Sequence, residues 1–194
     1  MRVILLIILS TLLLTILGCA ENNAPNEAVE GDATIGFIGC SNTRQTVQGY
    51  NFVGGEKIWG VQERKIHEYD GGALKDWAWN VDNSNKLWGV FDRYLENNPK
   101  TEMIWWQLCI RKEEADVNYE ESIPVLNAIR KRIPNVSIYV SPLPEFLEQE
   151  CGITGREGIE RAKTLAKEID EKNEDVFLGP VIGPLSPGDI DEDD

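Results

Sequence analysis

The sequence predicts an α/β domain, a three-layer flavodoxin-like sandwich built around a five-stranded parallel sheet. Two observations predict it. Short apolar runs that end at glycine or proline alternate along the chain with longer segments in which apolar residues recur every three or four positions. Helices between consecutive strands form crossover connections, which require parallel strands with helices on both faces of the sheet. The ligand crevice of such a sheet lies at the carboxyl ends of its strands.

Five runs are predicted as strands because they are short, rich in branched or aromatic residues, and followed by turn residues. They cover 34–39, 65–69, 102–108, 136–140 and 176–182. The run at 65–69 is the weakest, and Gly71-Gly72 ends it. Helices are predicted between the strands, at 42–48, from a cap at Ser84 through Leu95, at 122–133 and at 155–172.

The first 19 residues have the layout of a secretory signal. Arg2 supplies a positive start, and the apolar run that follows, of about 15 residues, is shorter than the roughly 20 that span a bilayer. The run ends in Ile16-Leu17-Gly18-Cys19, which resembles a bacterial lipobox. The alternatives are a plain anchor helix, or a cleaved signal without lipid.

The lipobox resemblance implies that residues 1–18 are a signal peptide and that Cys19 carries a thioether-linked diacylglycerol. Two acyl chains hold a protein stably on a membrane. The expected location is therefore the cell membrane, with the chain anchored by lipid and facing outside the cytoplasm. The membrane, reached through this lipid, is the first predicted partner.

Polar segments flank the predicted domain. Residues 19–33 are small, polar and acidic, and they predict a flexible tether; the domain covers 34–188, and 189–194 form an acidic tail. A formal net charge of −14 excludes nucleic acid as a partner, because such a surface repels phosphate. His67 is the only histidine and no Cys/His metal spacing is present, so neither a metal nor a cofactor is predicted.

Three cysteines remain if Cys19 is lipidated: Cys40, Cys109 and Cys151. An oxidising compartment permits disulfides, but three cysteines cannot all pair within one chain. Cys40 and Cys109 end neighbouring strands and can face one crevice, while Cys151 lies on the same edge as Cys109. The sequence leaves both pairings open.

Small polar residues follow the first predicted strand, in Gly39-Cys40-Ser41-Asn42-Thr43. A serine at the mouth of a helix directly after this strand lies in the crevice. The backbone N–H groups of its neighbours point there too. This geometry suits a serine nucleophile with an oxyanion hole.

The segment 35–43 (IGFIGCSNT), together with the strand order, resembles the first block of the SGNH (GDSL-like) hydrolases. These are esterases, lipases and carbohydrate deacetylases, with Gly-Asp-Ser where this chain has Gly-Cys-Ser. The resemblance implies that Ser41 is the nucleophile and that Gly72, or else Gly71, is the oxyanion glycine. Arg111 stands where the family has an oxyanion asparagine, and an arginine can also stabilise an anion, with a different reach.

The family takes its base from Asp-x-x-His after the last strand. Asp191 or Asp194 fits the aspartate, but no histidine follows in this sequence, and His67 near the second strand is a weak substitute. Serine without a base is a poor nucleophile. The resemblance therefore implies an esterase or deacetylase that is either impaired or cut off just before its histidine.

The alternative function is a lipid-anchored binding module that kept the fold and lost the reaction. Trp77 and Trp79 lie near the crevice and could stack on the sugar rings of a glycan, while Arg111 would bind a small anion. The competing interpretation of the two tryptophans is a lid packed over the sheet. An α/β lipoprotein with no site here is the third possibility.

Overall fold

The computed structural model describes residues 33–59, 71–81, 85–147 and 151–186. In this part of the chain, four strands form one sheet in the order β1-β2-β3-β4, and each neighbouring pair is parallel. The strands are β1 (Ile35–Ile38), β2 (Met103–Leu108), β3 (Ser137–Pro142) and β4 (Val176–Leu178). The predicted α/β class with a parallel sheet is confirmed for these four strands.

The fifth predicted strand, at 65–69, lies outside the described residues. On the outer side of β1, Ile58 forms a single parallel bridge with Ile35. The Ile35 amide donates to the carbonyl of Lys57 at 2.9 Å, and the Trp59 amide donates to the carbonyl of Ile35 at 3.0 Å. The segment around Ile58 therefore continues the sheet beyond β1, an arrangement compatible with a flavodoxin-like fold.

Helices follow the strands as the sequence predicts. They are α2 (Ser41–Phe52), α4 (Lys86–Asn97), α5 (Tyr119–Arg132) and α6 (Gly155–Lys172). α2 extends beyond the predicted 42–48 at both ends, and α6 has the predicted bounds. A short helix, α3 (Leu74–Ala78), was not predicted, because five residues are too few to show a helical period.

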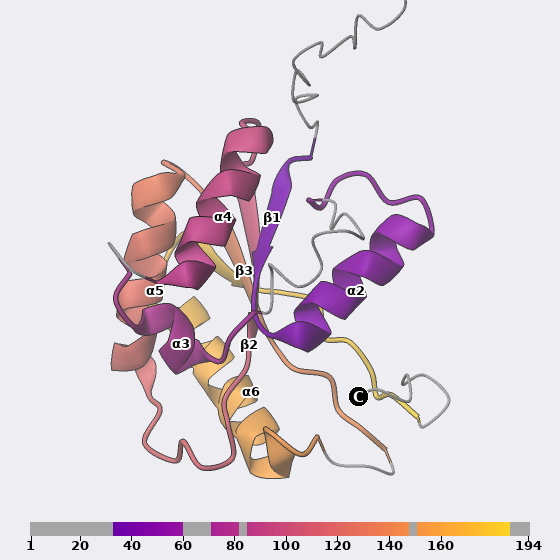
Figure 1. Cartoon of the computed structure of the whole chain (residues 1–194). Helices are drawn as coiled ribbons and strands as arrows, with labels where there is room; N and C mark the ends of the chain where they lie inside the picture. Colours follow the sequence, from indigo (N-terminus) through magenta and orange to yellow (C-terminus); the bar gives the residue numbers. More distant parts are fainter. Residues whose placement is uncertain (1–32, 60–70, 82–84, 148–150, 187–194) are drawn as a thin grey trace, which may run out of the picture.

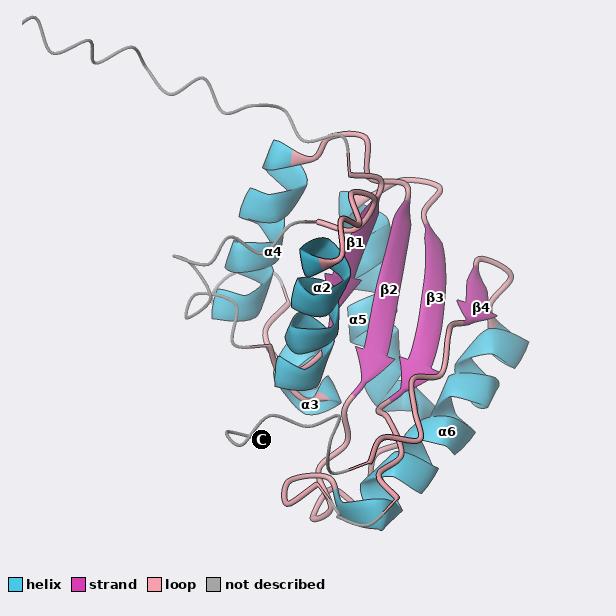
Figure 2. Cartoon of the chain, turned by 90° about the vertical axis from the view of Figure 1, so that its right-hand side faces the viewer, coloured by secondary structure: helices cyan, strands magenta, loops and turns pink. Residues whose placement is uncertain are grey.

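The helices lie on both faces of the sheet. α2 lies in front of the sheet in Figure 2, and α4 and α5 lie behind it, on the opposite side from α2 in Figure 1 as well. α6 contacts β3, β4 and α5, so it belongs to the same layer as α5. Arg130 of α5 binds both carboxylate oxygens of Asp175, just before β4, at 2.8 and 2.5 Å.

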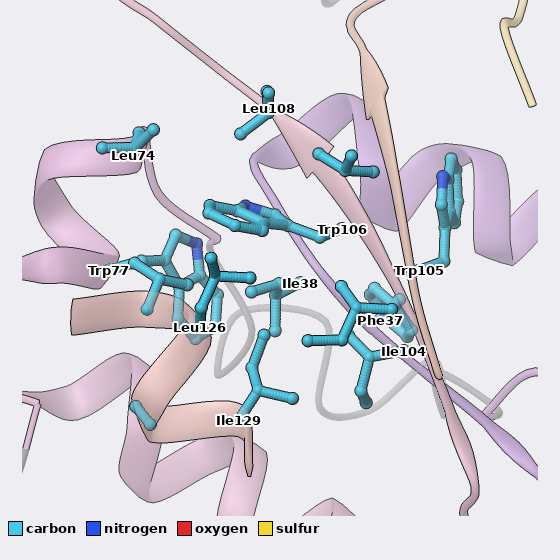
Figure 3. Packing of buried hydrophobic residues seen from close by; sticks show 14 of the residues in the cluster. Phe37, Ile38, Leu74, Trp77, Ile104, Trp105, Trp106, Leu108, Leu126 and Ile129 are labelled. Carbon is cyan, nitrogen blue, oxygen red and sulfur yellow. The ribbon is translucent and has the colours of Figure 1, made fainter. Parts of the chain in front are cut away.

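Aromatic rings fill the layer between the sheet and α4 and α5. The Trp77 and Trp88 rings meet edge to face with centroids 5.1 Å apart, and the Trp88 and Phe91 rings do so at 5.3 Å. Figure 3 shows Trp106 of β2 on this side of the sheet, whereas Trp105 points to the other. Each buried ring removes roughly 150–250 Å² from water, so this layer carries much of the hydrophobic stabilisation.

The opposite face of the sheet carries a second set of aromatic side chains. The Trp105 indole N–H donates to the Ser141 hydroxyl at 2.7 Å. The rings of Tyr139 and Phe177 lie with their centroids 5.5 Å apart. Phe177, on the edge strand β4, remains 43% exposed.

The N-terminal and C-terminal predictions fall outside the described part of the chain. The predicted signal peptide (1–18), Cys19, nearly all of the tether and the acidic tail (189–194) are not described. Among the helices that are described, none combines the length and apolar character needed to cross a bilayer.

Candidate active site at the carboxyl ends of the strands

Ser41 opens α2 two residues after Gly39, at the carboxyl end of β1. Cys40 is the N-cap of the helix, and the Ser41 side chain is half-buried. The first N–H groups of a helix have no acceptor within the helix, and in α2 the amides of Asn42 and Thr43 turn to the Cys40 sulfur. The structure therefore places Ser41 where the sequence predicts it, and its chemical role stays a prediction.

A tight turn joins β1 to α2. A Cβ at Gly39 would lie 2.1 Å from the Thr43 hydroxyl oxygen, so no larger residue fits there. That hydroxyl accepts from the Cys40 amide at 3.2 Å and donates to Oε1 of Gln107 at 2.7 Å. Because Thr43 is buried, these bonds fix the first turn of α2 against β2.

Gln107 is a site residue that the sequence reasoning missed. Its side chain is 0% exposed, and its Nε2 donor makes no hydrogen bond to any residue that the structure describes. A buried unpaired donor is costly, and this one lies beside the β1–α2 turn through the bond of Gln107 to Thr43. The available signal was a lone amide within the apolar strand MIWWQL.

The Gly71-Gly72 segment packs directly on the β1–α2 turn. Gly71 has a φ of +65°, and a Cβ on it would lie 2.6 Å from the Gly39 carbonyl oxygen. The Gly72 amide donates to that same carbonyl at 2.7 Å. Gly72 is thus at the predicted edge, but its N–H can serve an oxyanion only if this bond opens. Its predicted role stays a prediction.

The predicted glycan-stacking role of Trp77 is wrong. Its ring is 0% exposed, and its indole N–H donates to the Gly39 carbonyl at 3.0 Å. The reason is α3, which turns this side chain inward against the ring of Trp88. Trp79, the residue after α3, is 65% exposed, so its ring face is accessible to a ligand.

Arg111 follows β2 at the same edge, but two carboxylates already bind its guanidinium. It donates to Asp76 and, at 3.0 Å, to Glu114, which is buried. The pKa of Arg111 is raised, chiefly because the hydrogen bond to Asp76 stabilises the charged form. Asp76 also accepts from the Ala73 amide at 2.8 Å, so Arg111 ties the first turn of α3 to the loop after β2.

This arrangement bears on the oxyanion role that the sequence suggests for Arg111. The guanidinium lies at the carboxyl edge of the sheet, but its charge is already balanced by Asp76 and Glu114. Contact with a substrate oxygen would require one of these ion pairs to open. The oxyanion role of Arg111 stays a prediction, and the positioning role is what the contacts support.

Cysteine thiols gather at the same edge. Cys40 and Cys109 belong to one small apolar cluster, with Leu143 and Ile159 among its members. Cys40 packs against the part of this cluster that contains Cys109, and its thiol donates to Oδ1 of Asn42 at 3.5 Å. All of these cysteines are free thiols, so neither disulfide that the sequence left open is present.

The thiols of Cys40 and Cys109 differ in acidity. The pKa of Cys40 is lowered, first by the hydrogen bond from Cys109 and then by the amides of Asn42 and Thr43 at the start of α2. The pKa of Cys109 is raised by the same hydrogen bond and by burial. Cys40 is therefore the thiol that ionises first.

Among the described residues, no carboxylate or imidazole hydrogen-bonds the Ser41 hydroxyl, and no cluster of His, Cys, Asp and Glu could hold a metal ion. His67, the weak substitute for the base, and Asp191 and Asp194, which fit the aspartate of the family's last block, lie outside that part of the chain. A hollow of about 320 Å³ between the start of α5 and α6, lined by Asn118 and Arg161, contains no predicted site residue.

Comparison with known proteins assigns no family to this chain. No known family matches the sequence, and no curated protein matches it either.

Proposed function

We propose that the chain is an exported, cell-surface lipoprotein whose domain is an SGNH-type serine ester hydrolase, an esterase or carbohydrate deacetylase. The position of Ser41 carries the proposal. It is the first residue of the helix after the first strand, half-buried at the edge where parallel sheets bind ligands. The four parallel strands, extended by the bridge at Ile58, support the flavodoxin-like sheet that this family uses.

In this proposal the Ser41 hydroxyl attacks the ester carbonyl and forms a tetrahedral intermediate. The Ser41 amide, in the first turn of α2, would donate to the oxyanion, and the Gly72 amide would join it after releasing the Gly39 carbonyl. The proton of Ser41 must pass to a base, for which His67 is the substitute candidate, while Asp191 or Asp194 fits the aspartate that accompanies the histidine in this family. Without an imidazole beside Ser41, turnover is slow.

The alternative proposal is a non-catalytic, lipid-anchored module that binds a glycan. The exposed ring of Trp79 beside α3 favours it, because aromatic faces stack on sugar rings. A small anionic ligand is less well supported, since the carboxylates of Asp76 and Glu114 already occupy the guanidinium of Arg111.

Ester hydrolysis by the full-length chain tests the main proposal. p-Nitrophenyl acetate is incubated with the wild type, with Ser41→Ala, and with Thr164→Ala, which removes an exposed hydroxyl from α6 as the matched control. We expect Thr164→Ala to keep the wild-type rate and Ser41→Ala to fall to the uncatalysed rate. Equal rates for the wild type and Ser41→Ala would eliminate the hydrolase and leave the binding module.

The membrane anchor is tested separately, because it rests on the sequence of the first 19 residues alone. Cells expressing the full chain are fed a labelled fatty acid. We expect the label in the wild type and in Cys151→Ser, and none in Cys19→Ser. Label that survives in Cys19→Ser would place the lipid elsewhere, and an unlabelled wild type would remove the lipoprotein proposal.

A further inference from the structure

We propose that Cys40 and Cys109 are a redox-active pair that is oxidised to a reversible intramolecular disulfide, with Cys40 as the attacking thiol and Cys109 as the resolving thiol. The site is adjacent to Ser41, but it does not depend on ester hydrolysis. It would exchange with low-molecular-weight disulfides such as oxidised glutathione.

The strand register brings the two cysteines together. β1 and β2 are parallel neighbours with Ile38 opposite Trp106, so the continued register sets Cys40 opposite Leu108 and Cys109 one position further along. Adjacent strands are about 4.7–4.9 Å apart, and one residue along a strand adds roughly 3.3 Å at right angles to this. The expected Cα separation, on the order of 6 Å, falls within the roughly 4.4–6.8 Å that a disulfide requires. The Cys40 side chain also packs against the small apolar cluster that contains Cys109.

One loop holds both strand ends in place. The Gly72 amide donates to the carbonyl of Gly39 at 2.7 Å, and the Leu74 amide donates to the carbonyl of Cys109 at 2.8 Å. Gly71, between the two strand ends, touches the backbone of Cys40 so closely that no side chain fits. The separation of the two cysteines is therefore set by backbone contacts rather than by flexible side chains.

The surroundings of the two thiols assign their order of reaction. Cys40 is half-buried at the N-terminus of α2, where the Asn42 and Thr43 amides point at its sulfur and lower its pKa. Cys109 is 5% exposed, lies among apolar side chains, and has a raised pKa. A half-buried thiol of lowered pKa beside a fully buried thiol of raised pKa is the arrangement expected of an attacking and a resolving cysteine.

The proposed reaction proceeds in two exchange steps. The Cys40 thiolate attacks one sulfur of a small disulfide, the disulfide bond breaks, and one small thiolate leaves and takes a proton from solvent. Cys109 then loses its proton to solvent and attacks the Cys40 sulfur, which releases the second small thiol. In total two protein thiols are oxidised, and one small disulfide is reduced to two thiols.

Cys151 is the competing partner that the test must distinguish, because it also acts on Cys109 electrostatically. The reduced full-length chain, purified in detergent, is treated with oxidised glutathione, trapped with N-ethylmaleimide and mapped by peptide mass spectrometry. We expect a peptide pair joined through Cys40 and Cys109 in both the wild type and Cys151→Ser, and its loss on treatment with dithiothreitol. We expect Cys109→Ser to retain glutathione on Cys40.

Three results would overturn the proposal. Cys40 and Cys109 could both remain alkylated by N-ethylmaleimide in the oxidised wild type, the main disulfide could include Cys151, or Cys109→Ser could acquire no glutathione at Cys40. The first two are read on the wild-type chain, so they do not depend on whether a variant folds.

Discussion

The indole N–H of Trp77 donates to the carbonyl oxygen of Gly39 at 3.0 Å. Trp77 belongs to α3, which lies on the opposite side of the sheet from α2 (Figure 1), and its hydrogen bond holds the turn that carries Ser41. This turn thus depends on a tryptophan that the sequence suggested for ligand binding.

Replacing Trp77 by phenylalanine should destabilise the fold by about 1–2 kcal/mol, because it removes one buried hydrogen bond and part of a ring. Trp77→Ala should cost more, about 3–5 kcal/mol. Trp79→Ala is the control and should change the free energy of unfolding by less than about 0.5 kcal/mol, since its ring is exposed. Urea unfolding of the full chain measures all three. Equal losses of unfolding free energy in Trp77→Ala and Trp79→Ala would refute the structural role of Trp77.

Replacing either of two helix glycines by alanine should change the free energy of unfolding, and the two changes should have opposite signs. A Cβ at Gly158 of α6 would lie 2.3 Å from the Ile110 carbonyl oxygen, whereas nothing lies within 4 Å of one at Gly89 of α4. Gly89→Ala should stabilise the protein by roughly 0.5–1 kcal/mol through helix propensity. Gly158→Ala should destabilise it, because α6 must move away from the loop after β2. Thermal unfolding of both variants measures the change in Tm. A change of the same sign in both would contradict the close contact between Gly158 and the Ile110 carbonyl.

The pH dependence of Cys40 alkylation should show whether its lowered pKa comes from Cys109 or from the amides at the start of α2. The lowered pKa of Cys40 depends first on the hydrogen bond from Cys109. Iodoacetamide should therefore react with Cys40 along a profile whose midpoint lies below the ordinary thiol value of about 8.5. Cys109→Ala should move the midpoint up, and Cys109→Ser, which keeps a donor, should largely restore it. A midpoint that is the same in the wild type and in both variants would show that Cys109 does not set the acidity of Cys40.

Arg111→Gln should act mainly on stability. It leaves the buried carboxylate of Glu114 and the carboxylate of Asp76 without their guanidinium, and the expected loss is about 1–2 kcal/mol. Lys112→Gln, an exposed neighbour, is the control. Urea unfolding gives the stability, and p-nitrophenyl acetate gives the activity. A large fall in kcat without loss of stability would instead make Arg111 an oxyanion group.

The ion pair between Arg130 and Asp175 should contribute stability at neutral pH that acid removes. The pKa of Asp175 is lowered, chiefly by hydrogen bonds from Arg130. A carboxyl whose folded pKa is depressed stabilises the fold above its unfolded pKa, near 3.9, and loses this contribution as pH falls through the folded value. Asp175→Asn should cost at most about 1 kcal/mol at pH 7, since both side chains are partly exposed.

Urea unfolding at several pH values tests this pair. The difference between the wild type and Asp175→Asn should shrink steadily below about pH 4. A difference that stays constant down to the most acidic condition would mean that the charge of Asp175 is not what stabilises this contact. Asp116→Asn, whose carboxylate pairs with Lys75 in an exposed ion pair, should change stability little at any pH.

Much of the sheet could be predicted because its inner strands are largely buried on both faces. Strands such as β2, with only one polar side chain among six residues, give a continuous apolar run that is hard to misread. α6 was predicted with its correct bounds because its apolar positions keep a helical period through 18 residues. Ser41 follows from the same logic, since a residue directly after a buried strand must lie at the carboxyl edge.

The parts of the site that could not be predicted depend on tertiary contacts. Five residues of α3 carry no readable period, so the inward turn of Trp77 was missed. The pairing of Arg111 with Asp76 joins positions far apart in the sequence, and no local pattern shows it. The unpaired amide of Gln107 is likewise evident only once the Thr43 hydroxyl is seen to occupy its oxygen.

The contact of Gly71 with the β1–α2 turn determines where this crevice can be reshaped. Its missing side chain would meet main-chain atoms of Gly39 and Cys40, which cannot step aside as a rotamer can. Any side chain at position 71 would therefore displace the main chain that leads into Ser41. A change of shape at this edge has to come from side chains, such as that of Phe146, which packs on the same small cluster as Cys40.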